Sequence, residues 1–245
     1  MFTGGKKFAA IAAVLVATLA VARQAAAGTE PMVITLDSLL DGGENEGGIT
    51  IGDKRYSDFT FSSSASGGAV RVEADDVEVM FGMDGATHNV LFFFDLNASG
   101  GQRADMVIQY RLDVLNPSSS VRRVGLEFDG GPMGKGDGRS AASITETVST
   151  LDGTQIAQLT VFNDGENGLP DNWDDAEDIL PQQGLLFAKD ILVSARAGGA
   201  SVGIGAVQQT VEQAVIPLPA AFWAAIPVMG LIVGKKVRRL IPSRN

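Results

Sequence analysis

The first candidate for a functional site in this sequence is an acidic segment, residues 163–178, whose side chains carry many oxygen atoms. Ca²⁺ takes about six to eight oxygen ligands, which short-spaced asparagines and aspartates can supply from a tight loop. The candidate ligands are Asn163, Asn167, Asp171 and Asp174. The alternative interpretation is a solvated acidic loop with Trp173 packed beneath it, which needs no ion.

The same segment resembles one degenerate thrombospondin type 3 calcium repeat. Gly165 stands where that pattern has an aspartate, and the sequence holds a single copy. An EF-hand is excluded, because its terminal glutamate and flanking helices are absent. The resemblance implies calcium as the cofactor, through the matching residues Asn163, Asn167, Gly168, Pro170, Asp171 and Asp174.

Enzymatic chemistry has little support in the composition. The chain has no cysteine and one histidine, which excludes a thiolate nucleophile and a multi-histidine metal centre. His88 lacks the Gly-x-Ser-x-Gly elbow of a hydrolase, so we interpret it as an ordinary turn residue. Carboxylate pairs such as Asp75 and Asp76 fit a glycosidase only at a suitable separation in space. We expect a protein that is not an enzyme.

Charge is distributed unevenly along the chain. Eight of the 19 bases lie before residue 28 or after residue 217, and all 29 acids lie between those positions. The middle of the chain therefore has 11 bases, which gives it a formal charge of −18. A body this acidic repels phosphate backbones, so nucleic acid is excluded as a partner.

Residues 1–27 have the organisation of a secretory signal peptide. Lys6 and Lys7 precede an apolar run over residues 8–22. Ala25, Ala27 and Gly28 then form the small-residue site that signal peptidase cleaves. The alternative is an N-terminal membrane anchor, but the run is shorter than the roughly 20 residues that span a bilayer.

Residues 28–213 are expected to form one all-β domain, an antiparallel, jelly-roll-like β-sandwich of nine or ten strands. Apolar and polar residues alternate in short runs, as in Ile108–Gln109–Tyr110, and glycine-rich turns separate the runs. No interior stretch sustains a helical period. The expected strands cover residues 70–73, 77–79, 90–94, 108–114, 124–128, 144–150, 155–162, 185–195 and 201–211.

Residues 214–245 contain a proline motif, an apolar run and a basic cluster. The run over residues 221–234 is expected to form a transmembrane helix, and the basic residues belong on its cytoplasmic side. The body then lies outside the membrane. The motif consists of Ile216, Pro217, Leu218, Pro219 and Ala220, and the basic stop-transfer cluster of Lys235, Lys236, Arg238 and Arg239.

This tripartite end resembles the PEP-CTERM class of bacterial sorting signals, in its Pro-Leu-Pro-Ala variant. Pro-Leu-Pro replaces the usual Pro-Glu-Pro, and Pro227 interrupts the apolar run. The resemblance implies an inner-membrane-anchored precursor that exosortase cleaves near the motif, leaving a protein of the cell surface or of the extracellular exopolysaccharide (biofilm) matrix. The alternative is an ordinary C-terminal anchor that is never cut.

These observations favour an exported, non-enzymatic surface or matrix protein. The alternative function is a carbohydrate-binding module, with or without calcium, whose partner is exopolysaccharide; this alternative follows from what β-sandwiches commonly do. A hydrolase is the third hypothesis.

Overall fold

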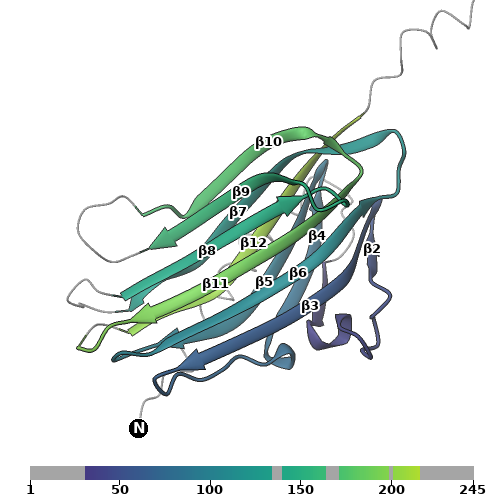
Figure 1. The fold of residues 1–245 in the computed structure, drawn as a ribbon. Helices are drawn as coiled ribbons and strands as arrows, with labels where there is room; N and C mark the ends of the chain where they lie inside the picture. The colour runs from purple at the N-terminus through teal and green to yellow at the C-terminus, as the bar shows by residue number, and fades with distance from the viewer. Residues whose placement is uncertain (1–30, 134–139, 164–170, 199–200, 216–245) are drawn as a thin grey trace, which may run out of the picture. The chain divides into compact units, whose positions relative to one another are not determined.

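The computed structural model describes residues 31–133, 140–163, 171–198 and 201–215, and in these ranges the protein is an all-β sandwich of two antiparallel sheets (Figure 1). The first sheet has the order β1-β4-β5-β12-β7-β10, and the second has the order β2-β3-β6-β11-β8-β9. The strands are β1 (Met32–Thr35), β2 (Ile49–Ile51), β3 (Lys54–Ser66), β4 (Glu78–Asp84), β5 (Thr87–Ala98), β6 (Arg103–Val114), β7 (Ser119–Met133), β8 (Ser140–Ser149), β9 (Gln155–Asn163), β10 (Asp174–Gln182), β11 (Gly184–Ala195) and β12 (Ser201–Val215). Two short 3₁₀ helices, η1 (Asp37–Leu39) and η2 (Ala74–Asp76), lie between strands.

The last eight strands have the topology of a jelly roll. β8 pairs with β9, β7 with β10, β6 with β11, and β5 with β12, all antiparallel. These nested pairs make one long double-stranded ribbon, whose strands alternate between the two sheets as the ribbon winds round. The strand order therefore confirms the expected jelly-roll-like arrangement.

Alternation along the strands builds the core between the sheets. In β8 every second residue is buried, and β11 has the same pattern from Leu185 to Ala195. Aromatic rings pack at its centre: Tyr110 stacks on Phe187 with ring centroids 5.0 Å apart and on Phe59 at 5.3 Å. Burial of these apolar faces is the main source of stability in such a domain.

The expected strands from residue 77 onward are present as β4 to β9, β11 and β12, although residues 77 and 150 lie just outside β4 and β8. The expected strand at residues 70–73 is wrong. Val70 is 81% exposed, and the carbonyl of Val72 accepts a hydrogen bond from the side-chain hydroxyl of Ser63 in β3, at 2.6 Å, and not from a backbone N–H of a strand ladder.

The expected transmembrane helix, the proline motif, the basic cluster and the signal peptide all lie outside the described residues. Within the described ranges, the protein contains no helix of the length and apolarity needed to cross a bilayer.

Candidate functional site

The described residues of the acidic segment belong to the end of one strand, the start of the next and the residues just before it. Asn163 is the last residue of β9, Asp174 is the first residue of β10, and Asp171 is exposed just before it. Asn167 lies outside the described residues. The expectation of a loop over the whole segment is wrong from Asp174 onward, because β10 is an edge strand paired with β7.

Backbone and side-chain contacts fix the start of β10. Phe162 and Asn172 exchange two backbone hydrogen bonds, of 2.7 and 2.9 Å, and the Asp175 carboxylate accepts one from the Thr160 N–H at 2.8 Å. Trp173 stacks on Phe128 with ring centroids 5.2 Å apart and is 43% exposed, so it lies against the surface. Across the described ranges, no three acidic or histidine side chains come close enough to hold a metal ion. The calcium site stays a prediction.

An open groove of about 580 Å³ lies at the other edge of the same sheet. Thr35, Glu78 and Phe93 form a cross-strand row over β1, β4 and β5 that lines it. Phe93 belongs to the outer face of the sheet, because its neighbours Phe92 and Phe94 are buried in the core. Asp95 lies two residues along the same face.

The groove is strongly acidic. Asp75 and Asp76 of η2 join Glu78 and Asp95 on its walls, and all four carboxylates are exposed. Arg71 is the base in its lining; it lies 3.3 Å from Glu73 and donates a hydrogen bond to the Ser63 hydroxyl at 3.0 Å. Hydroxyl-rich ligands suit such walls, because carboxylates accept hydrogen bonds and a phenyl face packs against C–H groups.

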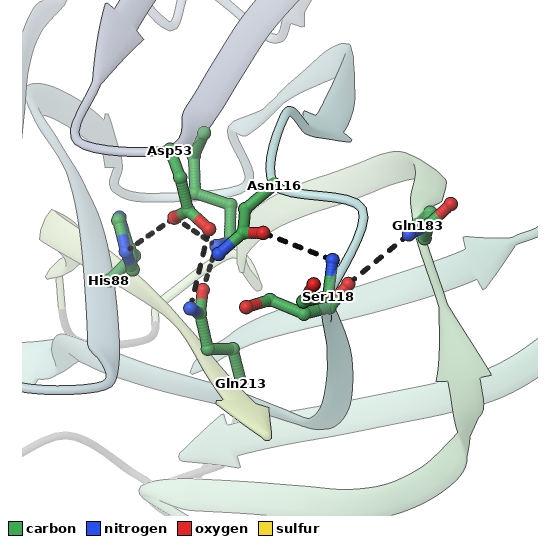
Figure 2. A network of polar contacts seen from close by, with 8 residues as sticks. Asp53, His88, Asn116, Ser118, Gln183 and Gln213 are labelled. Carbon is green, nitrogen blue, oxygen red and sulfur yellow. Dashed lines mark hydrogen bonds and ion pairs between the residues drawn. The ribbon is translucent and has the colours of Figure 1, made fainter. Parts of the chain in front are cut away.

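A polar network closes one end of the sandwich (Figure 2). Asp53, in the β2–β3 turn, contacts Lys54 at 2.6 Å and His88 at 3.6 Å, and it accepts a hydrogen bond from the Gln213 amide at 3.3 Å. Lys54 also donates to the Gln213 carbonyl. Residues from β3, β5 and β12 therefore meet at one carboxylate.

Charge and burial set the protonation states in this network. Burial acts to raise the pKa of Asp53, but the hydrogen bond and charge of Lys54 outweigh it, and the pKa is held below its ordinary value. Burial and the Lys54 charge lower the pKa of His88 to about 4, against a smaller opposing effect of Asp53. The ring is therefore neutral at pH 7, and its buried Nδ1 has no hydrogen-bond partner among the described residues.

Neighbouring turns are tied to the same end. The Leu115 N–H donates to the Asp53 carbonyl at 2.7 Å, and the Gln183 side chain donates to the Pro117 carbonyl at 3.0 Å. The Asn116 side chain accepts from the Ser118 N–H within its own turn (Figure 2). His88 is thus a buried strand residue in a structural network, and the interpretation of it as a turn residue is wrong.

A second polar cluster lies wholly inside the core and was missed at the sequence level. Glu146 of β8 forms an ion pair with Lys189 of β11, and Lys189 also donates a hydrogen bond to Gln209 of β12. All three side chains are buried. The alternation of β8 carries the signal, because Glu146 lies midway between Ile144 and Val148 and therefore on the same, buried face of the strand.

No family model and no curated protein matches the chain. Among solved structures, it is similar to the enzymatically active domain of tailspike protein 4 from bacteriophage CBA120, at 12% identity and a TM-score of 0.26, over 60% of this chain and 19% of that one. It is also similar to a carbohydrate-binding module, TmCBM61, in complex with β-1,4-galactotriose, at 16% identity and a TM-score of 0.29, over 60% of this chain and 86% of that one. The chain thus spans about a fifth of the tailspike domain. At these scores the similarity identifies neither a family nor a function.

Proposed function

We propose that this protein is an exported, non-enzymatic component of the cell surface or of the exopolysaccharide matrix, sorted and processed by exosortase. The observation that carries the proposal is the C-terminal order of proline motif, apolar run and basic cluster. The N-terminal sequence, with its n-region, apolar run and small-residue site, supports export of the same body.

The end of the fold is compatible with this processing. β12 ends at Val215, and the proline motif begins at the next residue, Ile216. Cleavage near Ala220 would therefore leave all twelve described strands in the released protein. Proline blocks strand pairing and helix continuation, so Pro217 and Pro219 favour an extended backbone that a protease can bind.

The buried state of His88 supports a non-enzymatic role. A general base near neutral pH needs a pKa close to the working pH and a reachable proton donor. His88 has its pKa lowered to about 4 and contacts Asp53 and no hydroxyl group among the described residues. A Ser–His–Asp relay therefore has no basis at this histidine.

Sorting is tested by fractionating the native host. Replacing Pro217 and Pro219 together by alanine should retain the full-length chain in the inner membrane, because the motif for exosortase is lost. Pro227→Ala is the matched control, since it removes a proline of the apolar run and leaves the motif intact; it should be released as the wild type is. Equal release of the double variant and the wild type would refute sorting at this motif.

Carbohydrate binding is the second candidate function, and the groove on β1, β4 and β5 favours it. Phe93 offers a ring for a sugar face, while Glu78 and Asp95 offer acceptors for its hydroxyls. An exposed matrix protein with such a groove would hold exopolysaccharide without cleaving it.

Affinity electrophoresis through gels containing the host's exopolysaccharide tests this role. Phe93→Ala and Glu78→Gln should each weaken retardation about tenfold, the loss of one stacking contact or charged hydrogen bond. Glu177→Gln, an exposed carboxylate of β10, removes the same charge away from the groove and should bind as the wild type does. Unchanged retardation in both groove variants would refute the groove as the binding site.

A further inference from the structure

Lys189 lies between an acid and an amide in the middle of the sandwich. Its Nζ forms the ion pair with Glu146 and donates the hydrogen bond to the Gln209 side-chain carbonyl. β11 and β12 belong to opposite sheets, so the Lys189–Gln209 contact crosses the core (Figure 1). The Gln209 amide nitrogen donates at 3.2 Å to the carbonyl of Thr210, which turns the amide carbonyl toward the lysine.

The surroundings of this cluster are apolar. The Lys189 and Glu146 side chains are both 0% exposed, and Nζ lies 5.8 Å from the Phe187 ring centroid and 5.9 Å from that of Tyr110. Among the described groups, the Glu146 oxygens receive no hydrogen bond that would compensate their charge beyond the ion pair with Lys189. A buried carboxylate with so little support is costly, which favours transfer of the lysine proton to it.

Burial lowers the pKa of Lys189 well below its ordinary value, so the side chain tends toward an uncharged amine. An uncharged amine has a free lone pair and is a nucleophile, as desolvated lysines are in enzymes. The neighbouring carbonyl is fixed in place, and such fixed proximity raises the rate of a reaction by many orders of magnitude.

We propose that Lys189 and Gln209 join in an intramolecular isopeptide bond, with Glu146 as the proton-transfer group. Glu146 and Gln209 fit different roles, since only the carboxyl can move a proton and only the amide has ammonia to lose. The bond links the two sheets covalently. A chain without cysteine has no disulfide for that purpose outside the cell.

The reaction balances without a co-reactant. Lys189 first gives a proton to Glu146, so that an amine faces a carboxylic acid. Nζ then attacks Cδ of Gln209, the new Nζ–Cδ bond forms, and the Cδ–Nε2 bond breaks. Glu146 gives its proton to Nε2, which leaves as ammonia, and takes one from Nζ. No group is oxidised or reduced. Glu146 starts as the carboxylate of the ion pair and ends as a carboxylic acid, because it keeps the one proton by which the lysine ammonium exceeds the linked amide and the ammonia.

Tryptic peptide mapping of the full-length protein tests the bond directly. A linked Lys189 resists trypsin, so residues 140–196 should appear as one peptide joined to residues 197–235. The joined species should be about 17 Da lighter than the sum of its two peptides, the mass of the ammonia lost. Separate peptides 140–189, 190–196 and 197–235 at unshifted mass would overturn the proposal. A loss of about 18 Da confined to residues 140–196 would also overturn it, since it would mark a Lys189–Glu146 amide instead.

Two variants test the assigned roles. Lys189→Met should abolish the joined species, because the nucleophile is gone. Glu146→Gln keeps the shape of the acid but has no transferable proton, and it should reduce the joined species at least tenfold. Full linkage in Glu146→Gln would overturn the role of the acid. The wild-type digest decides on the bond itself, even where a variant does not fold.

Discussion

Lys54 of β3 donates a hydrogen bond to Gln213 of β12 across the two sheets, which repeats the contact between Lys189 and Gln209. Both glutamines lie on β12, four residues apart, and both lysines are 0% exposed. The accompanying acids differ, because Asp53 is 25% exposed whereas Glu146 is fully buried. The same Lys–Gln contact is therefore present twice, once beside a partly exposed acid and once beside a fully buried one.

We expect the Lys54–Gln213 pair to stay unlinked. The pKa of Asp53 is held below its ordinary value, so Asp53 remains a carboxylate and has no proton for departing ammonia. In the digest described above, no peptide containing Lys54 should be joined to residues 197–235. A joined species at Lys54, in amounts equal to that at Lys189, would show that a buried acid is not required.

Stability should fall as the pH is lowered from about 6.5 to about 4, in part through His88. The folded-state pKa of this histidine is lowered to about 4, against an ordinary value of 6.5. In this range the unfolded chain therefore binds a proton that the folded chain does not, and the contribution to stability present above pH 6.5 is lost as the pH falls. The loss at pH 4 has an upper limit of about 3 kcal/mol.

His88→Gln separates this effect from that of the carboxylates. The variant keeps a polar side chain of similar reach but does not titrate, so its melting temperature should decline less between pH 6.5 and pH 4 than that of the wild type. The difference between the two curves is the measurement. Parallel curves over this range would mean that His88 does not couple protonation to folding.

Gly48 should not tolerate a side chain. Its φ of +87° favours glycine, and a Cβ there would lie 2.2 Å from the backbone carbonyl oxygen of Tyr56 in the β2–β3 hairpin. Gly48→Ala should lower the free energy of unfolding by about 2 kcal/mol or more. Gly47→Ala is the matched control, because a Cβ at Gly47 meets no atom within 4 Å, and its effect should stay within about 0.5 kcal/mol. Chemical denaturation of both variants measures the difference, and equal stabilities would contradict the hairpin geometry.

Calcium should raise the melting temperature in a concentration-dependent way if the acidic segment binds it in the folded state only. Asp171→Ala should remove most of that increase and leave the metal-free melting temperature equal or slightly higher, because one repelling charge is gone. Sodium at matched ionic strength is the control for charge screening. An unshifted melt at millimolar calcium, with no heat in calorimetric titration, would leave the segment as a solvated acidic face.

The strands that the sequence could predict are those with one apolar face. β6 alternates from Met106 to Val114, and β8 and β11 do the same, so their period of two is visible without a structure. β10 was missed because it is an edge strand, exposed at most positions, and carries acids on both faces. The whole of β3 was missed as well, because a bulge between Ser57 and Thr60 interrupts its alternation and the inner positions of its second half are only partly buried.

The polar clusters needed the three-dimensional arrangement. Lys189 and Gln209 are 20 residues apart on strands of opposite sheets, and only the nested pairing of the jelly roll brings them together. The groove likewise brings together residues of η2, β1, β4 and β5, and these residues do not form a recognisable sequence motif. A charged residue on the apolar face of a predicted strand, such as Lys189 between Phe187 and Ile191, is the sequence pattern that indicates a buried polar cluster.

Peptide mapping of the mature protein isolated from its native host tests the central claim most directly. The mature protein should begin at Gly28 and end near Ala220, because signal peptidase and exosortase each remove one end. Peptides from residues 231–245 in the mature surface or matrix protein would contradict sorting, and retention of residues 1–27 would contradict export by cleavage.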